Sequence, residues 1–228
     1  MVLLPSERVR RRLLRHHLPL LCVSAAFAAA LYFTRPYPDI VTRLSFCTAY
    51  PALVLLGITL VIGPWNMIRR RRNPVSSDLR RDIGIWAGIL GIAHTAVGQC
   101  VHLRGRPWLY YVYSPQEHHH GIRHDLFGFA NYTGAIAALL LALLLATSND
   151  WSLRGLGKQS WKRIQRWNYF VIALAGAHAI GYLMIEKQKL PFDSVVAACL
   201  VLVLVAQAWG YARRRRLSTH DGAHLPQS

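Results

Sequence analysis

Apolar residues occur along this chain in long blocks and not in the alternating pattern of an amphipathic soluble domain. Six blocks cover residues 18–34, 46–65, 83–102, 127–147, 167–185 and 193–211. Each is about as long as a helix that crosses the hydrocarbon core of a bilayer. Six such helices cannot all be buried in the core of one small soluble domain. The pattern therefore predicts an all-α integral membrane protein, built as a six-transmembrane-helix bundle.

Polar segments at the two ends complete the predicted organisation. Residues 1–17 form a basic cytoplasmic tail, residues 18–211 the six-helix transmembrane domain, and residues 212–228 a polar cytoplasmic tail. No small-residue cleavage signal follows the first apolar block, so we expect this block to be retained as a helix.

The charge distribution predicts which way the helices run. Of the 27 Lys and Arg residues, 20 lie in four segments that six spans would place on one side of the membrane, namely 1–17, 66–82, 148–166 and 212–228. Basic residues concentrate on the cytoplasmic side of membrane proteins. Both termini are therefore expected in the cytoplasm (N-in, C-in). Because the basic residues flank the spans, the net charge of +17 reflects topology and not binding to nucleic acid.

Most of the eleven histidines lie outside the apolar blocks. Four are expected on the solvated surface of the tails: His16, His17, His220 and His224. Four lie in the longest outer loop, 103–126, where three in a row are a weak metal-binding signal: His118, His119, His120 and His124. His102 lies at the outer end of the third block, where its ring can reach the membrane interface.

His94 and His178 differ from the others because they lie inside spans. An imidazole in hydrocarbon needs a compensating partner. The third and fifth spans run in the same direction, with His94 13 residues beyond Arg81 and His178 12 residues beyond Arg166. At about 1.5 Å per residue, both lie roughly 18–20 Å from the inner charged edge. The two histidines are thus predicted at nearly the same depth.

The neighbours of these two histidines allow two interpretations. Small residues lie one turn below and one turn above each ring: Gly91 and Gly98, then Ala175 and Gly181. They favour close helix packing, in which each His bonds a carbonyl or hydroxyl group. They also leave room for a flat macrocycle whose iron is ligated from both faces. We favour a haem with His94 and His178 as axial iron ligands. No CxxCH motif occurs, so the haem would be held without a covalent bond, as haem b.

Two stretches of the sequence resemble a known family. LRRDIGIWAGILGIAH covers residues 79–94, and LATSNDWSLRGLGKQSWKRIQRWNYFVIALAGAHAIGYL covers residues 145–183. They resemble the ferric reductase-like transmembrane domain superfamily, most closely its small bacterial MsrQ-type haem-binding membrane subunits, over roughly residues 75–210. The resemblance implies a multi-pass protein of the bacterial inner membrane that moves electrons through b-type haem.

The chain departs from the superfamily pattern at two positions. Members of the superfamily carry a pair of His on the third span and another on the fifth, and these hold two stacked haems. Here His94 and His178 fill the outer positions, whereas the inner positions fall at Arg80 and Gln165. Neither is an ordinary haem ligand, so we expect a single haem b. The resemblance also suggests an FMN or a quinone at the cytoplasmic side, near Arg80, Arg81, Trp161, Lys162 and Arg163.

The same resemblance implies an electron-transfer subunit, one component of an oxidoreductase. The sequence has no GxGxxG motif and no strand–helix alternation to host it. A separate cytoplasmic reductase or the quinone pool would then supply electrons. A metal ion or a periplasmic protein on the outer side would accept them, with loop 103–126 as the docking surface. Three arginines are expected near the haem propionates on the basis of their sign and side: Arg104, Arg106 and Arg123.

Two other functions remain open from the sequence. The first is a cofactor-poor structural or assembly subunit with the same fold, which the residues at Arg80 and Gln165 would suit. The second is a b561-type quinol-linked cytochrome, which normally needs two His pairs where this sequence offers one. A transporter is disfavoured because no Asp or Glu lies well inside a predicted span.

Overall fold

The computed structural model describes residues 5–34, 37–69, 75–118, 121–186 and 192–222. The long helices are α2 (Leu18–Thr34), α3 (Ile40–Ile68), α4 (Val75–Gly98), α5 (Leu126–Ala146), α7 (Asn168–Ile185) and α8 (Phe192–Gly222). Two shorter helices are α1 (Pro5–Arg12) and α6 (Asp150–Gln165). Within the described residues the only extended pairing is an isolated bridge between Val112 and Ile122. The fold is all-helical, as predicted.

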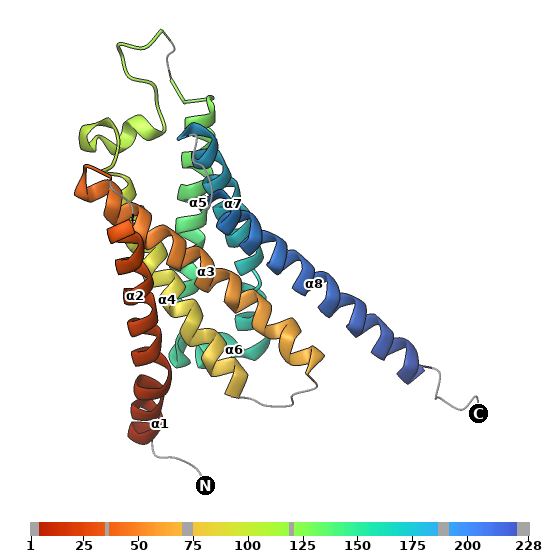
Figure 1. Cartoon of the computed structure of the whole chain (residues 1–228). Helices are drawn as coiled ribbons and strands as arrows, with labels where there is room; N and C mark the ends of the chain where they lie inside the picture. The colour runs from red at the N-terminus through yellow and green to blue at the C-terminus, as the bar shows by residue number, and fades with distance from the viewer. Residues whose placement is uncertain (1–4, 35–36, 70–74, 119–120, 187–191, 223–228) are drawn as a thin grey trace.

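The bundle has two distinct ends (Figure 1). The loop end holds residues 99–125, which connect α4 to α5. The α6 end holds α6, which lies across the bundle, together with α1 and the last turns of α8. These two names are used below.

Side-chain caps fix where two of the long helices begin. The carboxylate of Asp39 accepts a hydrogen bond from the Thr42 amide at 2.8 Å, and that of Asp125 accepts one from the Gly128 amide at 2.7 Å. Each carboxylate satisfies a first-turn N–H group that has no partner within its helix. The caps therefore set the starts of α3 and α5 at the loop end.

Five helical runs among the described residues are long and apolar enough to cross a membrane: Glu7–Thr34, Ile40–Met67, Leu126–Ala146, Asp150–Ile185 and Asp193–Arg213. They agree with the prediction of an all-α membrane protein. The predicted third span, 83–102, corresponds to α4 and is not among the five. Charged residues in the first turns of α4, such as Arg81 and Asp82, and the buried His94 make it less apolar than the others.

The predicted tails and inner loop are helical where the structure describes them. α1 continues through a π-helical turn, Leu13–His17, into α2. α6 occupies most of the predicted inner loop 148–166, and α8 continues to Gly222. A helix that a membrane span has already nucleated gains one hydrogen bond for each residue added, so polar residues extend it readily. Residues 223–228 lie outside the described part of the chain.

The core sits between α3, α4, α5 and α7. α3 packs mainly on α4, and α5 mainly on α7, while α2 and α8 cover α3 from outside. Leu56 and Leu60 of α3, Ala87 of α4 and Val171 of α7 are buried in the main apolar cluster. This arrangement directs the inner faces of α4 and α7 toward the same interior space.

Candidate functional site

His94 of α4 and His178 of α7 lie next to each other in the interior. Their ring centroids are 6.0 Å apart and the ring planes are inclined by 71°. The sequence analysis placed the two residues at one depth on two spans of the same direction. The structure brings them into a single site.

The same nitrogen of each ring is bonded to a backbone carbonyl of a neighbouring helix. His94 Nδ1 lies 3.0 Å from the Ser45 carbonyl oxygen on α3, and His178 Nδ1 lies 2.8 Å from the Ala130 carbonyl oxygen on α5. A carbonyl oxygen only accepts, so in both rings Nδ1 carries the proton and Nε2 keeps its lone pair. Neither Nε2 makes a hydrogen bond with the described residues. Histidines that ligate metals are commonly held in this way through the other ring nitrogen.

An apolar cavity surrounds the pair, lined from α3, α4, α5, α7 and α8. Three of the small residues singled out in the sequence line it: Gly91, Gly98 and Ala175. Gly181 serves a different purpose, because a Cβ atom there would lie 2.8 Å from Cβ of Ala130. Gly181 therefore allows α5 and α7 to pack closely, and it does not line the cavity.

Gly134 of α5 is a residue of the site that the sequence analysis missed. A Cβ atom at this position would lie 2.5 Å from Nδ1 of His178. A side chain there would displace the ring from the Ala130 carbonyl. Backbone partners and the glycine beside them leave no motif in the sequence, so only the folded chain identifies them.

Two histidine nitrogens are too few to hold a free metal ion but are enough for a metal that a cofactor already ligates. No group of three or more His, Cys, Asp or Glu side chains that could hold a metal ion occurs within the described ranges. A haem macrocycle supplies four nitrogen ligands and needs only two from the protein. His94 and His178 could supply these two ligands if a haem were bound, because each Nε2 keeps its lone pair.

Aromatic rings connect the histidine pair to the loop end. The ring centroid of Tyr182 lies 5.0 Å from that of His178. The Tyr182 ring also stacks on His102, with a centroid distance of 6.2 Å and an interplanar angle of 13°. His102 also contacts Phe127 and Tyr110, at 6.0 and 6.3 Å. His102 also lines the cavity, so its half-buried ring packs within the loop end, at the end of the predicted third span.

Of the arginines expected beside haem propionates, Arg106 and Arg123 are not among the cavity's lining residues. The Arg123 guanidinium donates to Asp125 at 2.9 Å and to Glu117 at 3.2 Å, which ties the loop together. Arg106 is exposed, and the side chain of Arg104 lies outside the described part of the structure. Arg123 therefore holds the loop in shape.

Arg80 and Gln165, at the inner positions of the family pattern, both line a second cavity at the α6 end. Arg81, Trp161 and Lys162 line it as expected, whereas Arg163 is exposed and is not part of the lining. The Gln165 amide donates to the Thr147 hydroxyl at 3.3 Å. Neither an amide nor a guanidinium is an ordinary iron ligand, so the second cavity offers no axial pair at these positions.

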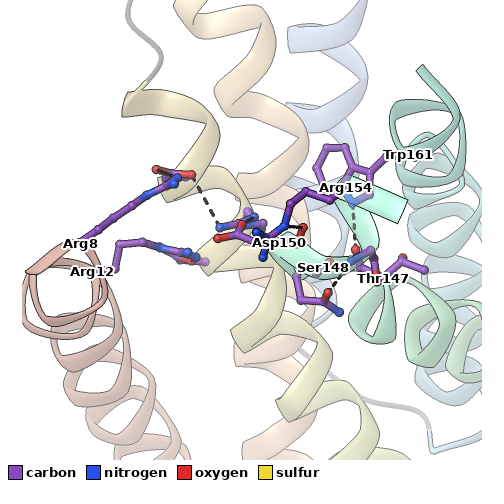
Figure 2. A network of polar contacts seen from close by, with 12 residues as sticks. Arg8, Arg12, Thr147, Ser148, Asp150, Arg154 and Trp161 are labelled. Carbon is purple, nitrogen blue, oxygen red and sulfur yellow. Dashed lines mark hydrogen bonds and ion pairs between the residues drawn. The ribbon is translucent and has the colours of Figure 1, made fainter. Parts of the chain in front are cut away.

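A buried carboxylate of α4 fastens the N-terminal helix to the α6 end, where Figure 2 shows the side chains of Arg8 and Arg12 extending from that helix toward α4. Asp82 of α4 is fully buried and accepts hydrogen bonds from Arg12 and from His16 Nδ1, the latter at 2.7 Å, with His17 Nε2 at 3.4 Å. Burial alone would raise the pKa of Asp82, but the hydrogen bonds from Arg12 and His16 hold that pKa below its usual range.

The expectation that His16 and His17 are solvated surface residues is therefore wrong. The π-helical turn Leu13–His17 has more residues per turn than an α-helix, so Arg12, His16 and His17 come onto one face. Nearby, Arg8 lies 3.3 Å from Asp78. In the sequence, the hint of this contact was Asp82, an acidic residue directly before the apolar block 83–102, in a chain whose N-terminal tail 1–17 is basic.

No family model matches the chain. The case for a function therefore rests on the two cavities and the side chains that line them.

Proposed function

We propose that this chain is a membrane b-type haem protein that relays electrons across the bilayer, with His94 and His178 as the axial ligands of one haem. The observation that carries the proposal is the matched pair of imidazoles 6.0 Å apart, each with Nδ1 bonded to a carbonyl. A simple packing role would account for one hydrogen-bonded His. It would not account for two such rings side by side in the lining of one apolar cavity.

The residues of the site have separate roles in this proposal. The carbonyls of Ser45 and Ala130 fix the tautomer and orientation of the two rings and make each Nε2 a better ligand. The apolar lining excludes water and lowers the local dielectric, which tunes the reduction potential. A bis-histidine haem b exchanges one electron at a time between ferric and ferrous iron and binds no substrate at the metal.

The proposed topology has six spans with both termini in the cytoplasm. α4 is the sixth span in this scheme, packed mainly against α3 and α5. The positions of α1, α6 and the end of α8 at one end of the bundle support it (Figure 1). The basic residues of these elements would then lie on the cytoplasmic side.

The two ends of the bundle suit different partners. We propose that electrons enter at the α6 end from a separate reductase or the quinone pool. They would leave at the loop end, to a metal ion or a periplasmic protein docked on loop 103–126. Exposed apolar side chains support a docking role for this loop, with Trp108 58% and Ile122 72% exposed.

The proposal is tested by a reduced-minus-oxidised absorbance spectrum of the purified protein, with a pyridine haemochrome assay for stoichiometry. A low-spin b-type spectrum with one haem per chain is the expected result. No haem from cells that can supply it would overturn the proposal in favour of the structural or assembly subunit. Two haems would mean that the second cavity has ligands other than Arg80 and Gln165.

A further inference from the structure

The second cavity, at the α6 end, carries positive charge that the described residues leave uncompensated. Four basic side chains line it and no carboxylate does: Arg80, Arg81, Lys162 and Arg166. Arg81 is engaged by Asp150 at 2.5 Å and by Asp78 at 3.8 Å. Within the described ranges, Arg80, Lys162 and Arg166 form no ion pair. Three cations around one cavity favour an anionic ligand.

The same cavity also has apolar side chains in its lining. Leu56 and Ile62 of α3 and Leu141, Leu144 and Leu145 of α5 line it. A small inorganic anion would leave these side chains without a partner, and a neutral ligand would leave the three cations without one. The cavity therefore suits an amphiphile with an anionic head and an apolar body.

The mouth of the cavity has the features of a membrane interface. Trp161 lines it, and its indole N–H donates to the Thr147 carbonyl at 2.8 Å, which fixes the ring. Lys162 and Arg166 are exposed. Tryptophan and basic side chains are typical of the headgroup level of membrane proteins. Basic pockets between helices on the cytoplasmic side are known sites for anionic lipid headgroups.

We propose that the second cavity binds an anionic phospholipid of the cytoplasmic leaflet, with its phosphate between Arg80, Lys162 and Arg166 and the start of an acyl chain against the leucines of α5. The superfamily pattern that the sequence resembles has a haem ligand at this position, whereas here Arg80 would bind a lipid phosphate. A phosphorylated flavin shares the phosphate chemistry, so the test separates the two sources. The inference goes beyond the proposed electron relay and does not depend on the haem.

Native mass spectrometry of the full chain in detergent tests this inference. Phosphatidylglycerol and phosphatidylcholine are titrated separately into the delipidated protein. Phosphatidylglycerol should bind with clear preference, and Arg80→Gln and Lys162→Gln should each weaken its binding about fivefold. Arg80→Lys should retain binding. Arg163→Gln is the matched control, because Arg163 is a basic residue of the same helix that does not line the cavity, and it should bind like the wild type.

Three results would overturn the inference. The first is equal affinity of the wild-type protein for the two lipids, a comparison that needs no variant to fold. The second is an equal loss in Arg163→Gln, which would indicate general surface attraction. The third is a stoichiometric flavin or quinone in the purified protein that is lost in Arg80→Gln. Lipid binding is read as a mass and haem as an absorbance, so failure of this inference is distinct from failure of the proposed relay.

Discussion

His94 and His178 are neighbours in the lining of one cavity and are bonded in the same way, each through Nδ1 to a backbone carbonyl, with the ring centroids 6.0 Å apart. The carbonyls come from α3 and α5, so four helices contribute to the orientation of two rings. Such an arrangement is preorganised, because the rings are held by backbone that cannot be moved without moving the bundle.

Replacing either histidine of the pair should remove the haem. His94→Ala and His178→Ala are each expected to abolish the low-spin b-type spectrum, because one imidazole cannot provide both axial ligands. His102→Ala should keep the spectrum, since its ring lies among Tyr110, Phe127 and Tyr182. Absorbance spectra of the three purified variants check this. Loss of the haem in His102→Ala alone would show that the ligands have been paired wrongly.

Gly134→Ala should disturb the site although it leaves both proposed iron ligands, His94 and His178, in the sequence. The new Cβ atom would lie 2.5 Å from His178 Nδ1, so the ring would lose its bond to Ala130. We expect Gly134→Ala to weaken haem retention about tenfold or more, measured by haem transfer to apomyoglobin. Gly84→Ala is the control, because Gly84 does not line the histidine cavity and its Cβ atom would lie 3.7 Å from Thr59 Cγ2, an ordinary contact. Equal retention in both variants would argue against a role for Gly134.

Neutralising Asp82 should destabilise the protein. Asp82→Asn leaves the half-buried Arg12 without its carboxylate and is expected to lower the free energy of unfolding by about 3 kcal/mol. Because the fold lowers the pKa of Asp82, its contribution is present above the ordinary carboxyl pKa of about 3.9 and is lost as the pH falls through the lowered value. Denaturant unfolding in detergent should therefore show the difference between the two proteins shrink below about pH 4.

Asp78→Asn provides the control for Asp82. The Asp78 side chain is 32% exposed and that of its partner Arg8 is 53% exposed, so the loss should stay below about 1 kcal/mol. Equal losses in the two variants would mean that burial of Asp82 contributes nothing to the attachment of the N-terminal helix.

Introducing one histidine at position 165 should not create a second haem site. Gln165→His places a single imidazole in a cavity that Arg80 also lines, and a bis-histidine haem needs two. We expect the haemochrome assay to give the wild-type ratio for Gln165→His, and a higher ratio only when Arg80→His is added. A gain from Gln165→His alone would reveal a further ligand in that cavity.

The apolar blocks predicted most of the helices because span length depends only on local composition. α2, α5 and α7 begin and end within a residue or two of the predicted blocks. The sequence also predicted that His94 and His178 share a depth, since depth along a helix follows from counting residues. Whether two residues at the same depth meet depends on how α4 and α7 pack against α3 and α5. Counting residues does not predict that packing.

The polar segments were the least predictable part. Their residues are mostly polar or charged, yet α1 is helical because it continues into α2, and α6 is helical with its start capped by the Asn149 side chain. Asp82 shows the same limit, since its partners Arg12 and His16 lie 70 and 66 residues away in the chain. Such contacts become visible only when the N-terminal helix is placed beside α4.

The π-helical turn Leu13–His17 makes the attachment of the N-terminal helix depend on chain length as well as on composition. Deleting one residue from this turn would let an ordinary α-helix run from α1 into α2. The segment before the deletion would then rotate by about 100° relative to α2. Arg8 and Arg12 would turn away from Asp78 and Asp82 although every charged residue was still present. The number of residues in this turn therefore sets how α1 is rotated relative to α2. A deletion there should destabilise the protein more than many substitutions.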